Sequence, residues 1–304
     1  MNEFQFVASK IPSLRGKLFV ITGGNSGVGY WSAYHLASKG ASVVIMGRNE
    51  NKAREAINSI RKDFLGVSIS FIKYDQSEPS SIFEAAEALK DIPIDGIVLN
   101  AGVYLPKKGA ANSLNNSLTF ATNALGTNTL FSLLRVTHPQ ARFVFVTSLV
   151  QKKPKDNNYS KYLLPNPKKR YEEYEASKRA VSDICLLGLQ DGFNCVLAHP
   201  GVAKTEILRD YAPLIKRIGN GFLYLFVHHA SKAALVEIIS LLDTTPKGSF
   251  VIPRGPFGIS GFPKIKKEAL RDNDHSLKAF RELLNLSLLD PWKIEATDIS
   301  HRSH

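Results

Sequence analysis

The sequence predicts an α/β fold in which a doubly wound parallel sheet of seven strands is covered by helices on both faces. Between residues 18 and 252, short apolar runs rich in branched residues alternate with longer amphipathic stretches, as expected of strands joined by crossover helices. The short runs contain few alternating polar residues, which is typical of strands that are buried on both faces. Both observations favour helices on the two sides of one sheet.

The expected strands are short apolar runs, at 18–21, 42–46, 68–74, 96–99, 142–146, 194–198 and 249–252. The amphipathic stretches predict helices, at 27–39, 50–63, 79–90, 112–136, 171–190 and 230–242. Two segments do not follow the alternation: the Lys/Pro/Asn-rich piece 151–170 and the region after 253, where one helix is expected near 276–287. We therefore expect a single domain over 1–304, with a core at 14–252 and a tail at 253–304.

Composition excludes several classes of protein. Of 304 residues, 44% are apolar and 22% charged, close to globular averages, so a disordered, collagen-like or coiled-coil chain is disfavoured. No run approaches the roughly 18 apolar residues that span a bilayer, and the first residues lack the apolar segment of a secretory signal, so a cytoplasmic protein is expected. Cys185 and Cys195 are too few for a disulfide framework or a four-thiolate zinc site.

The formal net charge of +12 favours anionic ligands or surfaces. Segment 151–170 holds seven basic residues and one acid, Asp156. The favoured interpretation is a solvated insert; the alternatives are that the segment attracts an anionic substrate or a phospholipid surface. Nucleic acid is disfavoured, because the charge is spread over several loops and no recognised binding motif accompanies it.

A glycine-rich turn follows the first expected strand and precedes a helical pattern. It reads Thr22-Gly23-Gly24-Asn25-Ser26-Gly27-Val28-Gly29. Glycines let a backbone adopt positive φ and approach a ligand closely, while a helix start offers unpaired N–H groups to a pyrophosphate. The position of the turn, between a strand and a helix at the start of the alternation, favours dinucleotide binding over a tight turn without a ligand.

The G-x-x-x-G-x-G spacing resembles that of the short-chain dehydrogenase/reductase family, whose turn reads T-G-x-x-x-G-x-G. Further landmarks of that family occur in its order at later strand ends: Asn100-Ala101-Gly102, Ser148, Tyr174-x-x-x-Lys178 and Pro200-Gly201-x-x-x-Thr205. The resemblance covers roughly residues 14–252 and implies a Rossmann-type fold and dimers or tetramers. The long spacing from Ser148 to Tyr174, with the Gly/Pro-rich segment after the last strand, looks most like the retinol-dehydrogenase-like branch.

The end of the second expected strand indicates which nucleotide binds. In a dinucleotide fold that prefers NAD, an acidic residue about 20 positions after the glycines binds the ribose hydroxyl, whereas Arg accommodates a 2′-phosphate. Gly47 and Arg48 occupy that point, so NADP is expected in preference to NAD; an ordinary surface Arg is the alternative. Asp75, after the third strand, resembles the family residue that meets the adenine, with a helix-capping Asp as the alternative.

Tyr174 and Lys178 are four residues apart in a helical pattern, which places both side chains on one face. A free phenol titrates near 10, so a Tyr that exchanges a proton near neutral pH needs positive charge nearby. An ammonium group at about 5 Å supplies about 3 kcal/mol at an effective dielectric constant near 20, or roughly two pKa units. The sequence therefore predicts Tyr174 as a general acid/base; a surface helix residue is the alternative.

The resemblance implies roles for the other motif residues. Lys178 also holds the nicotinamide ribose, Ser148 hydrogen-bonds the substrate oxygen, and Asn123 supports a proton relay, although Asn123 can also be read as a helix cap. Asn100 orders backbone around the cofactor. The segments expected to line the cofactor are those of the strand-end motifs: Asn100, Ala101 and Gly102, then Pro200, Gly201 and Thr205, for which a plain turn is the alternative.

These residues predict an NADP(H)-dependent oxidoreductase that interconverts a carbonyl and an alcohol on an apolar small molecule. Residues 207–229 are expected to cover the substrate as a lid, or else to pack as an ordinary helix. A non-catalytic dinucleotide-binding regulator on the same fold is the alternative, and a nucleotide-sugar enzyme would need a larger C-terminal domain. No metal is expected, because the adjacent His228 and His229 cannot converge on one ion from a helix.

Overall fold

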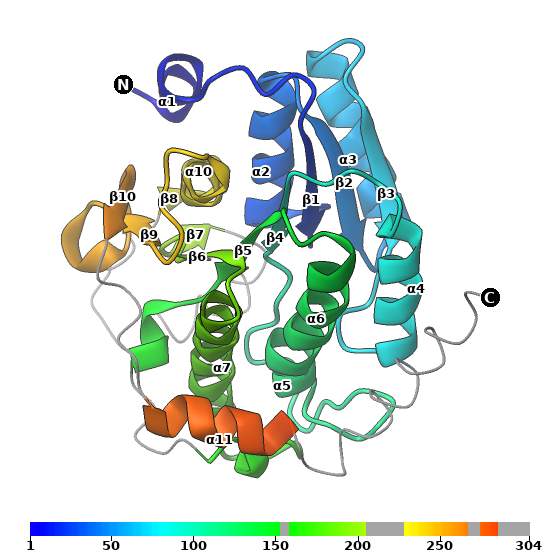
Figure 1. The fold of residues 1–304 in the computed structure, drawn as a ribbon, viewed down its shortest axis with the longest axis vertical. Helices are drawn as coiled ribbons and strands as arrows, with labels where there is room; N and C mark the ends of the chain where they lie inside the picture. The colour runs from blue at the N-terminus through cyan, green and yellow to red at the C-terminus, as the bar shows by residue number, and fades with distance from the viewer. Residues whose placement is uncertain (153–157, 205–227, 267–273, 285–304) are drawn as a thin grey trace.

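The computed structural model describes residues 1–152, 158–204, 228–266 and 274–284. Its main sheet has the strand order β10-β9-β6-β5-β4-β1-β2-β3 (Figure 1). The strands are β1 (Leu18–Thr22), β2 (Ser42–Gly47), β3 (Ile69–Lys73), β4 (Gly96–Leu99), β5 (Arg142–Val146), β6 (Asn194–Ala198), β9 (Phe250–Pro253) and β10 (Pro263–Lys266). All pair in parallel except β10, which is antiparallel to β9. A separate small sheet pairs β7 (Ala203–Lys204) with β8 (His228–His229).

Helices cover both faces of the main sheet (Figure 1). One face is covered by α1 (Glu3–Lys10), α2 (Gly27–Ser38), α3 (Glu50–Asp63) and α10 (Ala230–Leu241). The other is covered by α4 (Pro79–Leu89), α5 (Leu118–Phe120), α6 (Thr127–Thr137), α7 (Arg170–Gln190) and α11 (Asp274–Leu284). Short helical turns also occur in the described residues: η1 (Ala121–Gly126), η2 (Leu149–Lys152), η3 (Tyr159–Tyr162) and η5 (Pro256–Gly258).

The strands contribute to two hydrophobic cores in alternation. Val20 and Val44 face the core under α4, α6 and α7, whereas Phe19, Ile21 and Ile45 face the core under α2 and α10. All five are buried. The doubly wound α/β fold predicted from the sequence is therefore confirmed, and the absence of polar alternation reflects burial on both faces.

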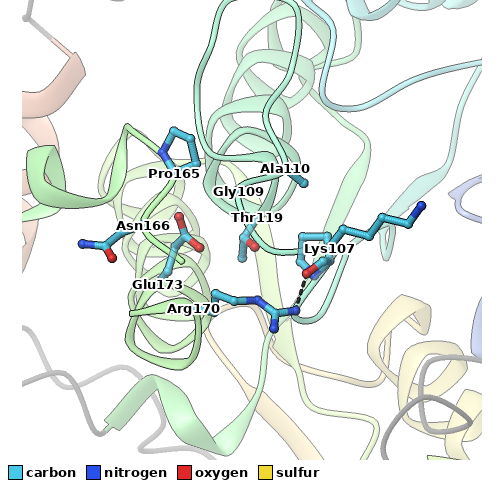
Figure 2. A pocket seen from close by; sticks show the side chains of 9 residues that line it. Lys107, Gly109, Ala110, Thr119, Pro165, Asn166, Arg170 and Glu173 are labelled. Carbon is cyan, nitrogen blue, oxygen red and sulfur yellow. Dashed lines mark hydrogen bonds between the residues drawn. The ribbon is translucent and has the colours of Figure 1, made fainter. Parts of the chain in front are cut away.

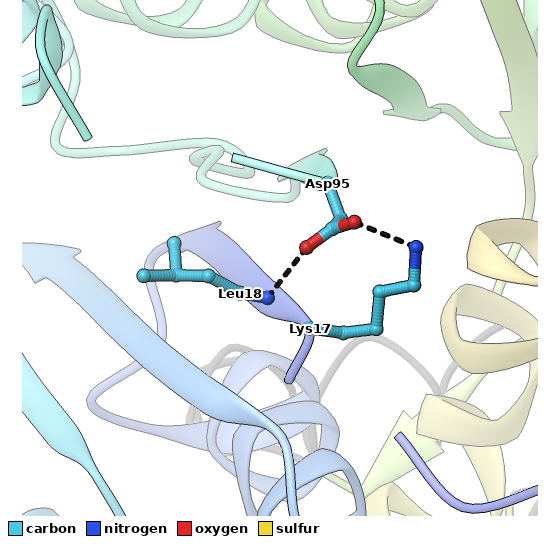
Figure 3. A network of polar contacts seen from close by, with 3 residues as sticks. All are labelled: Lys17, Leu18 and Asp95. Atoms are coloured by element: carbon cyan, nitrogen blue, oxygen red, sulfur yellow. Dashed lines mark hydrogen bonds and ion pairs between the residues drawn. The ribbon is translucent and has the colours of Figure 1, made fainter. Parts of the chain in front are cut away.

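A polar contact aligns β1 and β4 at the end of the sheet opposite the strand-end motifs (Figure 3). The Asp95 carboxylate accepts hydrogen bonds from the Lys17 ammonium at 2.7 Å and from the Leu18 backbone N–H at 2.8 Å. The same carboxylate raises the pKa of Lys17. Because β1 pairs with both β2 and β4, the strand order reverses here, and a crevice for a ligand is expected at the opposite, carboxyl end of these strands.

The structure differs from the expected elements at residues 112–117 and at β10, and it adds α1 and the small sheet of β7 and β8. The sequence predicts a helix over 112–136, but residues 112–117 form turns, because the Asn112 side chain accepts the N–H groups of Leu114 and Asn116 and Asn115 adopts φ +59°. Beyond the seven expected strands, β10 is an eighth. It begins with Pro263 at the sheet edge, where proline is tolerated, and exposes Lys264 and Lys266, so it lacks an apolar run.

Candidate active site

The glycine-rich turn leaves its backbone accessible at the start of α2. Gly23 has φ +69° and its N–H donates to the carbonyl of Met46 at 2.7 Å. A Cβ on Gly29 would lie 2.5 Å from the Gly23 carbonyl oxygen, so the turn closes this tightly only with glycine. The N-cap residue of α2, Ser26, makes no side-chain capping bond to the first-turn N–H groups. The turn and helix start therefore fit a pyrophosphate, with the dipole of α2 favouring negative charge.

Arg48 lies beside this turn, at the end of β2. It is exposed, and its neighbours contact the turn: the Asn25 amide donates to the Asn49 carbonyl at 3.3 Å, and a Cβ on Gly47 would meet the Asn25 side chain at 3.2 Å. Asp75 is half-buried after β3, and its Oδ1 accepts the N–H and the hydroxyl of Ser77. Glu78, and not Asp75, occupies the N-cap position of α4, and its side chain makes no capping bond, so Asp75 orders the turn before the helix.

The end of β4 is hydrogen-bonded to the turn. The Asn100 amide donates to the Thr22 carbonyl at 2.8 Å, and the Ala101 N–H donates to the Thr22 hydroxyl at 2.8 Å. The side chain of Val28 packs against Ala203 and the start of α10. Asn100 therefore fixes backbone between two strand ends, which is the kind of role that the resemblance implies for it.

Asn123 lies in the single π-helical turn η1 and is buried. Its Oδ1 accepts the Val103 N–H at 2.8 Å, and its amide donates to the Val103 carbonyl at 2.9 Å and to the Ser177 hydroxyl at 3.0 Å. The side chain thus joins the segment after β4 to α7. π-helical turns are frequent at functional sites, and this side chain caps no helix end.

Lys178 is buried where α7 meets the end of β5. Its ammonium donates to the Val146 carbonyl at 3.0 Å, and its backbone carbonyl accepts the Thr147 hydroxyl at 2.8 Å. A Cβ on Gly102 would lie 3.4 Å from the Lys178 Nζ and 3.0 Å from the Asn123 Oδ1. Burial lowers the pKa of Lys178 to about 8, partly opposed by the charge of Glu237. Lys178 remains mostly protonated at neutral pH.

Tyr174 lies one turn before Lys178 on α7 and is half-buried. Its ring packs edge-on against Tyr104, with centroids 4.4 Å apart and an interplanar angle of 69°. Ser148 is the second residue after β5 and is half-buried; its Oγ accepts the Val150 N–H at 3.5 Å. The residues predicted to be catalytic therefore lie on η1, after the end of β5 and on the first half of α7.

The turn after β6 is closely packed. Gly201 has φ +84°, and a Cβ on it would lie 2.3 Å from the Ile259 carbonyl oxygen, while His228 Nε2 lies 2.9 Å from the Pro200 carbonyl oxygen. Thr205, most of the expected 207–229 lid and residues 153–157 of the basic segment lie outside the described residues.

Several polar residues of the site were not singled out from the sequence. The buried Gln76 amide donates to the carbonyls of Ala101 and Thr122 and to the Thr127 hydroxyl, at 3.0, 2.7 and 3.0 Å. Buried His199 follows β6, and desolvation lowers its pKa to about 4. Both side chains follow strand ends, and that position is the signal that could have identified them.

Within the described ranges, His, Cys, Asp and Glu side chains form no group of three or more that could hold a metal ion. Within the same ranges, no helix is both long enough and apolar enough to cross a membrane.

Sequence comparison relates most of the chain to known oxidoreductases. The family model described as short chain dehydrogenase matches residues 17–213. An uncharacterised oxidoreductase of Schizosaccharomyces pombe is 29% identical over 230 residues, which is 70% of this chain and 68% of that protein. A short-chain dehydrogenase/reductase of Armillaria gallica is 27% identical over 85% of this chain and 86% of its own length. Human polyprenol dehydrogenase is 30% identical over 132 residues, 42% of this chain and 39% of that protein.

Solved structures share the fold. An uncharacterised protein from Mycobacterium paratuberculosis superposes with a TM-score of 0.70 at 23% identity, covering 94% of this chain and 96% of that one. A 3-oxoacyl-(acyl-carrier-protein) reductase from Agrobacterium tumefaciens with NADP bound has a TM-score of 0.56 at 20% identity, covering 75% of this chain and 87% of its own.

Proposed function

The chain belongs to the short chain dehydrogenase family and is an oxidoreductase acting on CH–OH groups, and from this premise we propose that it is an NADP(H)-dependent enzyme that interconverts a carbonyl and an alcohol on an apolar small molecule. The observation that carries the proposal is the position of Tyr174 one turn before buried Lys178 on α7, with the Lys178 ammonium bonded to the end of β5.

The residues present fit a nicotinamide dinucleotide. We assign the pyrophosphate to the backbone of the turn, from Thr22 through Gly29, because the crowding at Gly29 and the uncapped start of α2 form a cradle for an anion. Arg48 would meet the 2′-phosphate and Asp75 the adenine. Beyond the turn, the pyrophosphate and nicotinamide parts of the cofactor would contact the segments that follow β4 and β6. These segments are residues 100–102, residues 200–201 and Thr205.

In the mechanism that we propose, hydride transfer would be the chemistry of a bound nicotinamide, and the residues of this chain would hold and move the proton. Ser148 would hold the substrate oxygen, and the Tyr174 hydroxyl would donate its proton to that oxygen during reduction or take it back during oxidation. The Lys178 ammonium, held by the Val146 carbonyl, stabilises the phenolate. Asn123 ties this part of α7 to the segment after β4, which supports its assignment to a proton relay.

The remaining assignments follow from the sequence and the relatives. An apolar substrate is supported by the human relative named polyprenol dehydrogenase. We further propose one domain over 1–304, with a core at 14–252 and a tail at 253–304 that completes the substrate side, a cytoplasmic location, association into homo-oligomers and membership of the retinol-dehydrogenase-like branch.

The test is a panel of apolar aldehydes and ketones with NADPH, followed by absorbance, for the wild type and for Tyr174→Phe. The variant should lose roughly 10³-fold or more in kcat while its NADPH affinity, from fluorescence titration, is unchanged. Tyr171→Phe, at an exposed position on the same helix, is the matched control and should retain full turnover. Wild-type turnover by Tyr174→Phe would refute the assignment of the acid/base.

A further inference from the structure

The loop after β4 is fastened to the first residue of α7. The Arg170 guanidinium donates through Nη2 to the backbone carbonyls of Leu105 and Pro106. Figure 2 shows this side chain reaching from α7 toward the loop that carries Lys107 and Gly109. Arginine suits such a contact because its donors are planar and stay charged.

The loop needs this fastening because its backbone is strained at the same point. Leu105 has φ +44°, a left-handed conformation that costs a residue other than glycine about 1–2 kcal/mol. It also precedes Pro106, whose ring restricts the residue before it. Between loop and helix lies a hollow lined on one side by Lys107 and Gly109 and on the other by Arg170 and Glu173 (Figure 2). The two hydrogen bonds of Arg170 therefore tie the strained backbone to α7 beside this hollow.

The strained loop carries Tyr104 against the ring of Tyr174. Arg170, Tyr174 and Lys178 follow each other at four-residue spacing, so successive turns of one face of α7 contact the loop carbonyls, the Tyr104 ring and the end of β5. Both rings are half-buried, and the edge-on geometry is that of a favourable aromatic pair.

We propose that Tyr104 is a positioning residue for Tyr174 and that Arg170 acts on the same hydroxyl through Tyr104, by holding the Leu105–Pro106 backbone. The inference rests on the proposed function, in which Tyr174 exchanges the proton. Tyr104 limits the rotamers of the Tyr174 ring and keeps its hydroxyl directed to the substrate oxygen, a geometry in which small displacements have large effects on rate.

The experiment measures kcat, KM and NADPH affinity for single variants. Tyr104→Ala should lower kcat about 10- to 100-fold with NADPH affinity within about twofold of the wild type. Tyr104→Phe keeps the ring and should retain most of the wild-type kcat. Arg170→Met should lower kcat about 5- to 30-fold, and Arg170→Lys, which keeps a charged donor, should lie between. Lys169→Met is the matched control: this exposed residue precedes Arg170 and pairs with Glu172, and its loss should leave kcat unchanged.

The double variant separates one chain of contacts from two independent effects. If Arg170 acts through Tyr104, then Arg170→Met/Tyr104→Ala should have the kcat of Tyr104→Ala alone. The proposal would be overturned if the losses of kcat in the two single variants added up in the double variant. It would also be overturned if Tyr104→Ala kept the wild-type kcat, or if Tyr104→Phe lost as much kcat as Tyr104→Ala. Hydrogen exchange gives a readout that does not depend on activity: exchange over 105–110 should rise in Arg170→Met and stay at the wild-type rate in Lys169→Met, and equal rates in all three proteins would also overturn the proposal.

The failure of this inference is distinguishable from the failure of the proposed function. An inactive Tyr174→Phe beside a fully active Tyr104→Ala refutes the positioning role alone. An active Tyr174→Phe refutes the acid/base assignment and the positioning role with it.

Discussion

The two halves of the proposed site differ in which atoms shape them: backbone atoms in one half and buried polar side chains in the other. In the proposed nucleotide half, formed by β1, β2, β3, α2 and α3, the glycine-rich turn is shaped by the backbone at Gly23 and Gly29. In the proposed catalytic half, formed by β4, β5, β6, η1, α6 and α7, the buried side chains of Asn123 and Lys178 each bond to segments distant in sequence. A backbone site depends on local geometry, whereas a side-chain site depends on the whole fold being in place.

This difference explains which residues the sequence could identify. The glycine spacing is local, so the turn is recognised from eight consecutive residues. The partners of Asn123 are Val103 and Ser177, which only the fold brings together. The comparison predicts that substitutions in the catalytic half disturb stability and turnover together, and that those at the nucleotide half disturb cofactor affinity.

The largest effect is expected at Gly126, where the catalytic half also depends on backbone. A Cβ there would lie 1.8 Å from the Gln76 carbonyl oxygen. Because this is a backbone atom, the chain around Gln76 would have to shift to relieve the clash. Gly126→Ala should lower the free energy of unfolding by at least about 3 kcal/mol, measured by urea denaturation. The control is Gly192→Ala, which meets no atom within 4 Å and should cost about 1 kcal/mol, because its φ is +90°. Equal losses in the two variants would contradict this packing.

Removing the Asn123 side chain should have the next largest effect. Asn123→Ala leaves the Val103 N–H and carbonyl and the Ser177 hydroxyl without this partner in a buried place, at a cost of about 2–4 kcal/mol in unfolding free energy. Calorimetry and NADPH titration should show lower stability with unchanged cofactor affinity. Asn128→Ala, at a half-buried position on α6, serves as the control. An affinity loss as large as the stability loss would remove the distinction between the halves.

Lowering the pH should reduce the free energy of unfolding through two buried histidines, His35 in the nucleotide half and His199 in the catalytic half. Burial lowers the pKa of His35 on α2, and of His199 after β6, from 6.5 to about 4. Between these values the unfolded chain binds a proton at each site and the folded chain does not, so stability is complete above about 6.5 and falls as the pH drops toward 4. Each histidine should account for about 2 kcal/mol at a pH of about 5.

Denaturation at about pH 7 and about pH 5 checks this expectation, with His35→Gln and His199→Gln each losing less stability on acidification than the wild type. The comparison must be between variants, because Glu237 acts in the opposite direction: burial raises its pKa to about 7, so its contribution falls as the pH rises from 4.5 toward 7. Equal acid losses in wild type and variants would show that neither histidine is responsible.

The smallest of these effects is expected at the exposed edge of the nucleotide half. Arg48→Asp should weaken NADPH binding about tenfold or more and NADH binding much less, because the carboxylate would repel the 2′-phosphate. Fluorescence titration with both nucleotides measures this selectivity. Arg54→Asp, at an exposed position on α3, should weaken the binding of neither nucleotide. If NADPH and NADH lose equal affinity, Arg48 does not contact the 2′-phosphate.

The sequence predicted the seven parallel strands because each is an apolar run buried on both faces, which tertiary context cannot easily override. It failed at residues 112–117 because the side chain of Asn112 bonds to local backbone in competition with a helix. Tyr104 and Arg170 could not be found from the sequence, because neither belongs to a motif and their contacts join residues more than sixty positions apart.

The two edge strands of the sheet restrict how copies of this chain can associate. β10 presents Lys264 and Lys266 to solvent and begins with Pro263, while β3 at the other edge exposes Lys73. A second copy that extended the sheet by adding a strand would place its edge lysines next to these lysines. At β10, Pro263 would also offer no N–H for a hydrogen bond to the added strand. Growth of the sheet by strand addition is thus opposed at both margins.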